Sequence, residues 1–84
     1  DEPGFVSARV IAMIINEAYF ALDEGVSTKS EIDIAMKLGT NYPFGPFEWS
    51  DKIGIDNVYQ LLQQLAVTDK RYTPSTLLQK EAVI

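Results

Sequence analysis

The chain lacks several residue types on which common functions depend. It has no cysteine, which excludes a disulfide framework, a thiol nucleophile and a cysteine-ligated zinc site. It has no histidine, the commonest general base and metal ligand. Basic residues are few and scattered, seven Lys and Arg against twelve Asp and Glu, and the net charge is −5. A surface that follows nucleic-acid phosphates is therefore not expected.

Long apolar runs and nucleotide-binding motifs are absent as well. The longest apolar run, Val10 to Ile15, is far short of a membrane span, and there is no recognisable signal peptide or targeting segment. We therefore expect no membrane partner and a cytoplasmic protein. The glycines at 39 and 45 lack both the G-x-G-x-x-G spacing and the strand–turn–helix context of a dinucleotide site. Neither a cofactor site nor a metal site is predicted in these 84 residues.

Helical periodicity runs through the chain, and no alternating strand pattern is present. The fold class predicted is all-α, a small bundle of about five helices built around a long apolar first helix, in one domain over residues 1–84. Gly25 suits the left-handed cap that ends the first helix, and Ser30 with Asp33 is an imperfect capping box for the second. Thr73 and Pro74 read as cap and first residue of the last helix. The predicted helices extend over about residues 4–23, 30–39, 46–53, 55–67 and 74–84.

The first predicted helix has more apolar surface than one buried face requires. At 100° per residue, Arg9, Asn16 and Asp23 lie on one polar stripe, which Met13 and Phe20 interrupt. The rest of the circumference is apolar. Two interpretations stay open: another chain or domain covers the second side, or the helix is central and its own domain surrounds it.

The polar residues of the chain do not form an obvious reacting pair. Arg9 is the strongest single candidate for a functional role, with an ion pair to Glu17 as the alternative. Asn16 is expected to bond buried backbone or a dimer contact rather than a ligand. Acidic neighbours such as Asp23 and Glu24 are expected to be charges that the helix dipole or solvent stabilises, so no acid–base couple is predicted.

The stretch NYPFGPFEW, residues 41–49, holds four of the nine aromatic residues. Pro43 disfavours helical geometry just before it, Gly45 relieves backbone strain, and Pro46 begins the next helix. These features predict a tight helix-to-helix corner whose rings plug the core. A corner at a helix N-terminus also suits an apolar or anionic ligand, which Phe44 or the backbone amides would contact. Composition alone leaves both interpretations open.

Several separated motifs resemble the C-terminal domain of the NAD-dependent 3-hydroxyacyl-CoA dehydrogenase family. The resemblance extends over about residues 3–60 and implies a helical fold like the C-terminal domain of 6-phosphogluconate dehydrogenase. It also implies a two-domain enzyme, in which a Rossmann domain that is absent from this chain binds NAD and supplies the catalytic histidine–glutamate pair. The motifs stand in the family's order and spacing and include Pro3-Gly4-Phe5, Asn16-Glu17-Ala18, Ala35-Met36, Gly39 and Gly45-Pro46-Phe47.

By the same resemblance, the helical domain forms a homodimer through its first helix and closes over the acyl-CoA substrate. The family oxidises L-3-hydroxyacyl-CoA to 3-ketoacyl-CoA in fatty-acid degradation. Tyr42 and Phe44 are then the rings expected nearest the acyl-CoA, and Phe47 and Trp49 those expected in the core. The isolated 84 residues are predicted to be inactive.

One position departs from the family pattern. The family motif reads Pro-Gly-Phe, two variable residues, then Asn-Arg, and that asparagine reaches the active site. Here Ala8 precedes Arg9. An alanine side chain makes no hydrogen bond, so no catalytic residue is assigned to this chain. The alternative function is a non-catalytic helical dimerisation module that kept the fold and lost the activity.

Overall fold

The computed structural model describes residues 7–25, 27–40 and 43–82, and every regular element in these ranges is a helix. This confirms the predicted all-α class. None of the helices in the described ranges has the length and apolarity that a membrane crossing requires. The elements, in chain order, are α1 (Ala8–Asp23), α2 (Lys29–Thr40), α3 (Pro46–Ile53), α4 (Ile55–Thr68), the 3-10 helix η1 (Lys70–Tyr72) and α5 (Thr76–Ala82).

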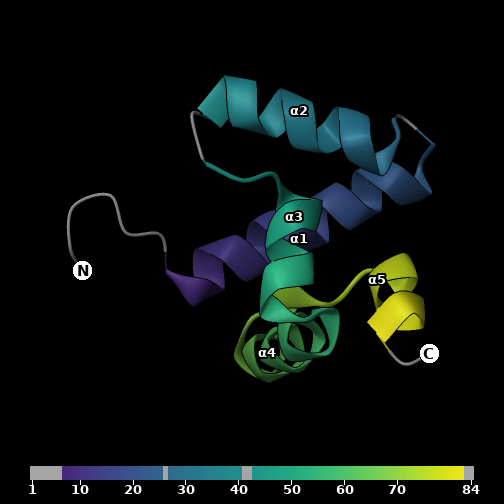
Figure 1. Ribbon diagram of the computed structural model, residues 1–84. Helices are drawn as coiled ribbons and strands as arrows, with labels where there is room; N and C mark the ends of the chain where they lie inside the picture. The colour runs from purple at the N-terminus through teal and green to yellow at the C-terminus, as the bar shows by residue number, and fades with distance from the viewer. Residues whose placement is uncertain (1–6, 26, 41–42, 83–84) are drawn as a thin grey trace.

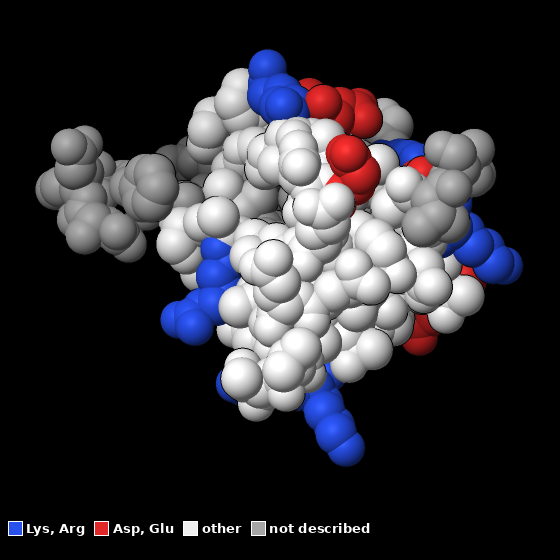
Figure 2. Space-filling view, turned by 90° about the horizontal axis from the view of Figure 1, so that it is seen from below, with Lys and Arg blue, Asp and Glu red and all other residues white. Residues whose placement is uncertain are grey.

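The long helix α1 crosses the molecule, and the other helices are arranged around it (Figure 1). Helix α3 crosses α1, while α4 and α5 pack against α1 from below. Helix α2 lies above, where it packs against α3. Seen from below, the molecule has a broad uncharged area with charged groups toward its margins (Figure 2). Helix α4, which lies at the bottom of Figure 1, has no charged residue after Asp56, in agreement with this uncharged area.

The core is built by four of the five α-helices. Its buried apolar side chains come from α1, α3, α4 and α5, and none comes from α2. Phe47 and Trp49 are among them, as predicted, and the Phe47 ring meets Tyr19 edge-on at 4.9 Å between centroids. The buried apolar residues are Ala12, Ile15, Ala18, Tyr19, Phe47, Trp49, Val58, Leu62 and Leu78.

The domain itself covers α1 on one side. Ala12, Ile15 and Tyr19 are buried in the core, whereas Met13 and Phe20, the residues that interrupt the predicted polar stripe, are exposed. Met13 and Phe20 belong to the polar arc, so their exposure does not decide between the two interpretations. The described residues of the apolar arc are buried or half-buried apart from Ala8, and cover by another chain stays a prediction.

Helix α1 begins later than predicted and ends where predicted. Ser7 caps it by accepting a hydrogen bond from the Val10 N–H at 3.3 Å. The predicted first turn, from residue 4, lies outside the described residues. Gly25 has a φ of +75°, a left-handed conformation that glycine adopts without strain, and this confirms the predicted end of the helix.

The capping box of α2 is formed by a different pair from the predicted Ser30 and Asp33. The Thr28 N–H donates to Glu31 Oε1 at 3.0 Å, and the Glu31 N–H donates to Thr28 Oγ1 at 3.2 Å. This pair has the Thr-x-x-Glu spacing that the reciprocal bonds require. Asp33, two residues further on, is instead turned toward α3.

The last helix begins at Thr76, and its cap is Ser75 rather than the predicted Thr73. The Ser75 hydroxyl accepts a hydrogen bond from the Leu78 N–H at 3.0 Å. Thr73 is used otherwise, because its hydroxyl donates to the Lys70 carbonyl at 2.7 Å and closes the 3-10 turn η1. The sequence did not predict η1, so Thr73 was assigned to the wrong element.

Candidate functional site

The corner between α2 and α3 depends on a close approach of two backbone segments. A Cβ atom added to Gly45 would lie 2.5 Å from the Cα, Cβ and Cγ atoms of Asp33. The φ of Gly45 is −81°, an ordinary value for any residue. Glycine is therefore required here for space, and the predicted relief of backbone strain is not its role.

Asp33 fixes the start of α3. Its Oδ1 accepts a hydrogen bond from the Phe47 N–H at 2.8 Å, which satisfies one of the free N–H groups of the first helical turn. Burial raises the pKa of the Asp33 carboxyl above its ordinary value, although the bond from Phe47 opposes the shift. The side chain of Glu48 completes the cap by accepting from the Gly45 N–H at 2.8 Å. This bond, together with Lys37, lowers the pKa of Glu48.

Phe44, one of the two rings predicted to lie near a ligand, is half-buried just before α3 and packs against the core. The ammonium group of Lys52 lies 4.6 Å from the centroid of this ring, within cation–π distance. The structure thus pairs an apolar ring with a cation at the corner. Tyr42, the other predicted ring, lies outside the described residues. Ala8 is exposed at the first position of α1.

The two polar residues singled out on the first helix have different surroundings. Asn16 is 2% exposed; its Nδ2 donates to the Thr73 carbonyl at 2.9 Å, and its Oδ1 accepts from the Ser75 N–H at 2.8 Å. The prediction that Asn16 satisfies buried backbone is confirmed. Arg9 is exposed, and the ion pairs found among the described residues include none between Arg9 and Glu17.

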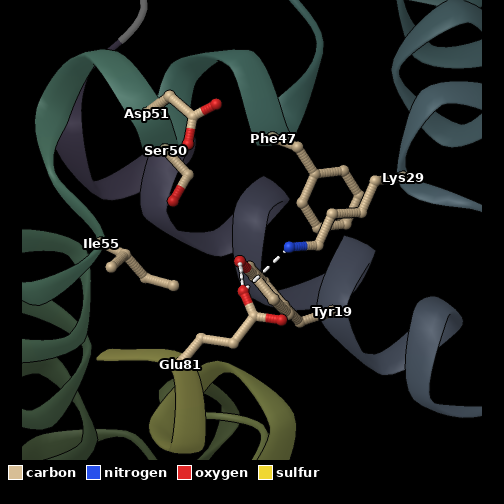
Figure 3. Close-up of a pocket in the computed structure, with 7 residues that line it drawn as sticks. All are labelled: Tyr19, Lys29, Phe47, Ser50, Asp51, Ile55 and Glu81. Atoms are coloured by element: carbon tan, nitrogen blue, oxygen red, sulfur yellow. Dashed lines mark hydrogen bonds and ion pairs between the residues drawn. The ribbon is translucent and has the colours of Figure 1, made fainter. Parts of the chain in front are cut away.

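A polar cavity of about 150 Å³ lies beside the core (Figure 3). Two donors converge there on Glu81 of α5: the Tyr19 hydroxyl lies 2.7 Å and the Lys29 ammonium 2.9 Å from the same oxygen, Oε1. Lys29 also lies 5.6 Å from the ring centroids of Tyr19 and Phe47. The residues that line the cavity are Tyr19, Lys29, Phe47, Ser50, Asp51, Ile55 and Glu81.

The charges of Lys29 and Glu81 in this cavity are paired with each other. Burial raises the pKa of Tyr19 well above that of an ordinary tyrosine, and the bond to Glu81 raises it further. Burial opposes ionisation of Glu81 too, but the bonds from Tyr19 and Lys29 outweigh it and lower the pKa of Glu81. At neutral pH Tyr19 is therefore a neutral donor and Glu81 a paired carboxylate, so neither is poised as a general base.

The cluster around Glu81 was missed in the sequence, and no spacing rule would have found it. Tyr19 and Glu81 are 62 positions apart, and only the packing of α5 against α1 brings them together. The described residues also contain no group of three or more carboxylates arranged to hold a metal ion.

A second, apolar depression of about 460 Å³ lies between α1 and α2, and we refer to it as the α1–α2 groove. Its wall on α1 includes the exposed Met13 and the half-buried Ile14 and Ala21, and the walls carry a single charged residue, Glu17. Apolar surface of this kind, left open in a small domain, is typical of a contact site. The residues that line the groove are Met13, Ile14, Glu17, Ala18, Ala21, Ile32 and Met36.

Known proteins resemble this chain over nearly its whole length. The sequence profile of the 3-hydroxyacyl-CoA dehydrogenase C-terminal domain matches residues 4–82. A 3-hydroxyadipyl-CoA dehydrogenase of Escherichia coli is 43% identical over 86 residues, which is 100% of this chain and 18% of that protein. A probable 3-hydroxybutyryl-CoA dehydrogenase of Bacillus subtilis is 44% identical over 82 residues, 95% of this chain and 29% of that protein.

Solved structures agree with the sequence matches. A crystal structure of 3-hydroxybutyryl-CoA dehydrogenase from Escherichia coli superposes with a TM-score of 0.87 at 44% identity, over 99% of this chain and 18% of that one. A crystal structure of (S)-3-hydroxybutyryl-CoA dehydrogenase from Ralstonia eutropha gives a TM-score of 0.83 at 39% identity, over 95% and 29% of the two chains. The chain thus spans less than a third of the length of these relatives.

Proposed function

Because the chain belongs to the family of the 3-hydroxyacyl-CoA dehydrogenase C-terminal domain, we propose that it is the helical dimerisation and acyl-CoA-covering domain of an NAD-dependent L-3-hydroxyacyl-CoA dehydrogenase. Such an enzyme oxidises a 3-hydroxyacyl-CoA to the 3-ketoacyl-CoA, in fatty-acid degradation and in the cytoplasm. The observation that carries the proposal is the family match over residues 4–82. In the full-length protein a Rossmann domain is the partner that binds NAD.

The described residues do not fit a nicotinamide cofactor of their own. Every regular element in them is a helix, and the sequence has no G-x-G-x-x-G motif, so they offer no strand–turn–helix site for a pyrophosphate. Hydride chemistry is what the cofactor supplies when it is bound to its own domain. This chain's part of the reaction is to hold and cover the acyl-CoA.

The corner at the start of α3 is the surface that we assign to substrate covering. The half-buried ring of Phe44 offers apolar contact to an acyl group, and hydrogen bonds from the Gly45 and Phe47 N–H groups fix the start of α3 that follows it. Lys52, 4.6 Å from the ring centroid, is a cation next to that contact, which suits a thioester whose CoA part is anionic. We assign Tyr42 to the same surface from the family resemblance.

The α1–α2 groove is the surface that we assign to the homodimer. It is apolar apart from Glu17, and the exposed side chains of Met13 and Phe20 continue its α1 wall outward. Interface centres of permanent dimers are apolar in this way. The proposed dimer therefore forms through α1.

A second candidate function is a dimerisation module without dehydrogenase activity, and Ala8 is the observation that favours it. Ala8 is exposed at the first position of α1, where the family has an asparagine that reaches the active site. Its methyl group offers no hydrogen bond to a substrate. An enzyme of this family would need another residue to align the substrate.

The two candidates are separated by assaying the full-length natural protein with acetoacetyl-CoA and NADH. The first candidate predicts turnover, and it predicts that Phe44→Ala raises KM for acetoacetyl-CoA by about fivefold, equivalent to about 1 kcal/mol of lost ring contact. Val67→Ala is the matched control, because Val67 is exposed on α4 away from the corner. Its KM is expected to equal that of the natural protein.

Absence of turnover in this assay would support the second candidate. A folded full-length protein that dimerises but turns over neither acetoacetyl-CoA nor longer 3-ketoacyl-CoA substrates supports the non-catalytic module. In that case Ala8→Asn, which restores the family residue, is the variant in which activity is expected to return. Under both candidates the 84-residue chain alone is expected to show no NADH oxidation.

A further inference from the structure

Helix α2 contacts the rest of the molecule through a row of charged residues. Lys29, Asp33 and Lys37 recur every fourth residue, so they lie on one side of the helix, and we call them the polar stripe. All three face the body of the domain and contact other helices. The outer side of α2 is apolar instead: Ile34 is 53% and Leu38 82% exposed. Two further apolar residues, Ile32 and Met36, are half-buried, so the apolar surface of α2 is divided between the groove side and the exposed side.

Each member of the polar stripe makes one charged contact. Asp33 Oδ1 accepts from the Phe47 N–H at the start of α3, and this contact is buried. The two flanking contacts are partly exposed ion pairs with carboxylates of other helices. They join Lys29 Nζ to Glu81 Oε1 at 2.9 Å and Lys37 Nζ to Glu48 Oε1 at 3.1 Å.

Apolar packing holds α2 only weakly. Asp33 is the one buried residue among residues 29–39, and the hydrophobic core receives no buried side chain from α2. Ile32 and Met36 are half-buried along the α1–α2 groove, which separates the two helices with about 460 Å³ of open space. Among the described half-buried apolar residues that pack against the core, Ile32 is the one from α2.

The ion pairs of α2 and the apolar contacts of the body contribute unequally to the free energy of folding. Partly exposed ion pairs contribute about 0–1 kcal/mol each and weaken as salt screens them. Burial of a large apolar side chain contributes about 1.5–3 kcal/mol, and the body contains nine buried apolar residues. Segments with few buried apolar contacts open locally at a lower free energy than the whole domain unfolds.

We infer that α2 is a flap that opens as a unit from the body of the domain, and that the charged contacts of the polar stripe set how often it opens. Gly25, with its left-handed φ of +75°, precedes the flap, and the corner around Gly45 follows it. Opening separates Asp33 from the Phe47 N–H and widens the α1–α2 groove. The flap thereby links the groove to the corner that carries Phe44. This inference concerns the fold, and a partner seated in the α1–α2 groove, as in the proposed dimer, would reduce the opening of α2.

Hydrogen–deuterium exchange on the full-length natural protein tests the flap, by comparing peptides from α2 with peptides from α4. Backbone amides of α2 are expected to exchange at least about tenfold faster than those of α4, because they exchange through local opening. Raising the salt from about 20 mM to about 0.5 M is expected to speed exchange in α2 about threefold and to leave α4 unchanged, since the ion pairs are screened.

A double variant tests the role of the charges directly. Lys29→Met with Lys37→Met keeps helix propensity and chain length but removes both ion pairs. Exchange in α2 is expected to rise about fivefold and to lose its salt dependence. Lys70→Met is the matched control, because Lys70 is an exposed cation on η1 outside the stripe, and it is expected to change neither helix.

Equal exchange rates in α2 and α4 of the natural protein would overturn the inference, since both helices would then open only by global unfolding. If exchange in α2 of the natural protein does not respond to salt, the charged contacts of the polar stripe do not control the opening. The same conclusion follows if the double variant speeds exchange in α4 as much as in α2. These readouts are independent of dehydrogenase activity, so failure of the proposed function does not affect them.

Discussion

At the scale of single residues, buried polar side chains join segments that are far apart in the chain. Asn16 uses both ends of its amide to hold the connection before α5, at Thr73 and Ser75. Asp33 holds the first turn of α3 through the Phe47 N–H. Both bonds satisfy backbone groups that would otherwise be costly to bury. The polar residues thus position loops and helix ends, while the rings fill the core.

Gly45 is the residue at which a single added methyl group is expected to do most harm. Gly45→Ala places a Cβ 2.5 Å from backbone and side-chain atoms of Asp33, so the corner must move. The free energy of unfolding is expected to fall by about 2–3 kcal/mol, the usual cost of overpacking. Urea denaturation followed by circular dichroism measures it.

Gly39 provides the matched control for this variant. It lies within α2, and a Cβ added there meets no atom within 4 Å. Gly39→Ala is expected to raise the free energy of unfolding by about 0.5–1 kcal/mol, because alanine favours a helix. Equal effects of the two substitutions would show that the close approach of Asp33 to Gly45 does not limit the corner.

At the scale of elements, some helix ends are set by a capping side chain and others by a glycine, and the sequence rules find some of these residues and misplace others. The left-handed Gly25 after α1 follows the rule for a helix C-terminus. The start of α5 does not follow from its neighbours, because two adjacent candidates, Thr73 and Ser75, both suit an N-cap. Tertiary contacts decide between them, since Asn16 binds on either side of Pro74.

The two candidate caps are expected to differ in their contribution to stability. Ser75→Ala removes the acceptor of the Leu78 N–H in a buried place, and the free energy of unfolding is expected to fall by about 1–2 kcal/mol. Thr73→Ala removes only the exposed bond to the Lys70 carbonyl and is expected to cost about 0.5 kcal/mol. Denaturation midpoints of the two variants give the comparison. A larger loss in Thr73→Ala would return the cap to the position first predicted.

At the scale of the whole molecule, the apolar surface is unevenly distributed. The body formed by α1, α3, α4 and α5 buries one side of α1, whereas the α1–α2 groove leaves the other side open. The exposed apolar residues of α2, Ile34 and Leu38, add to the outward-facing apolar surface of this region. Such a distribution is typical of a domain that works in contact with other protein surfaces.

The proposed dimer predicts a specific response to a charge in the groove. Met13→Glu places a second carboxylate beside Glu17, and desolvating it in an interface is expected to raise the Kd of the dimer about 100-fold, equivalent to about 3 kcal/mol. Sedimentation equilibrium of the full-length natural protein measures the Kd. Val67→Glu is the control, because Val67 is exposed on α4 outside the groove. A monomeric natural protein, or equal effects of the two charges, would contradict a dimer formed through α1.

The sequence by itself determined the helical class, the approximate extent of α1, α3 and α4, and the corner at residues 43–46. These follow from local rules, namely apolar spacing, glycine at helix ends and proline at helix starts. The prediction that Phe47 and Trp49 lie in the core came from the family resemblance, and the structure confirms it. The family resemblance rested on the order of such local motifs.

Only the tertiary structure decided which polar groups meet. Neither the bonds of Tyr19 and Lys29 to Glu81 nor the inward face of α2 at Asp33 follows from local spacing, because each depends on where distant helices pack. The need for glycine at position 45 is also a tertiary effect. Asp33, which lies close to Gly45 in the fold, leaves no room for a side chain there. Local rules give the approximate extent of most helices, whereas packing fixes what their faces touch and, at α5, which residue caps the helix. The cavity, the α1–α2 groove and the proposed flap all depend on packing.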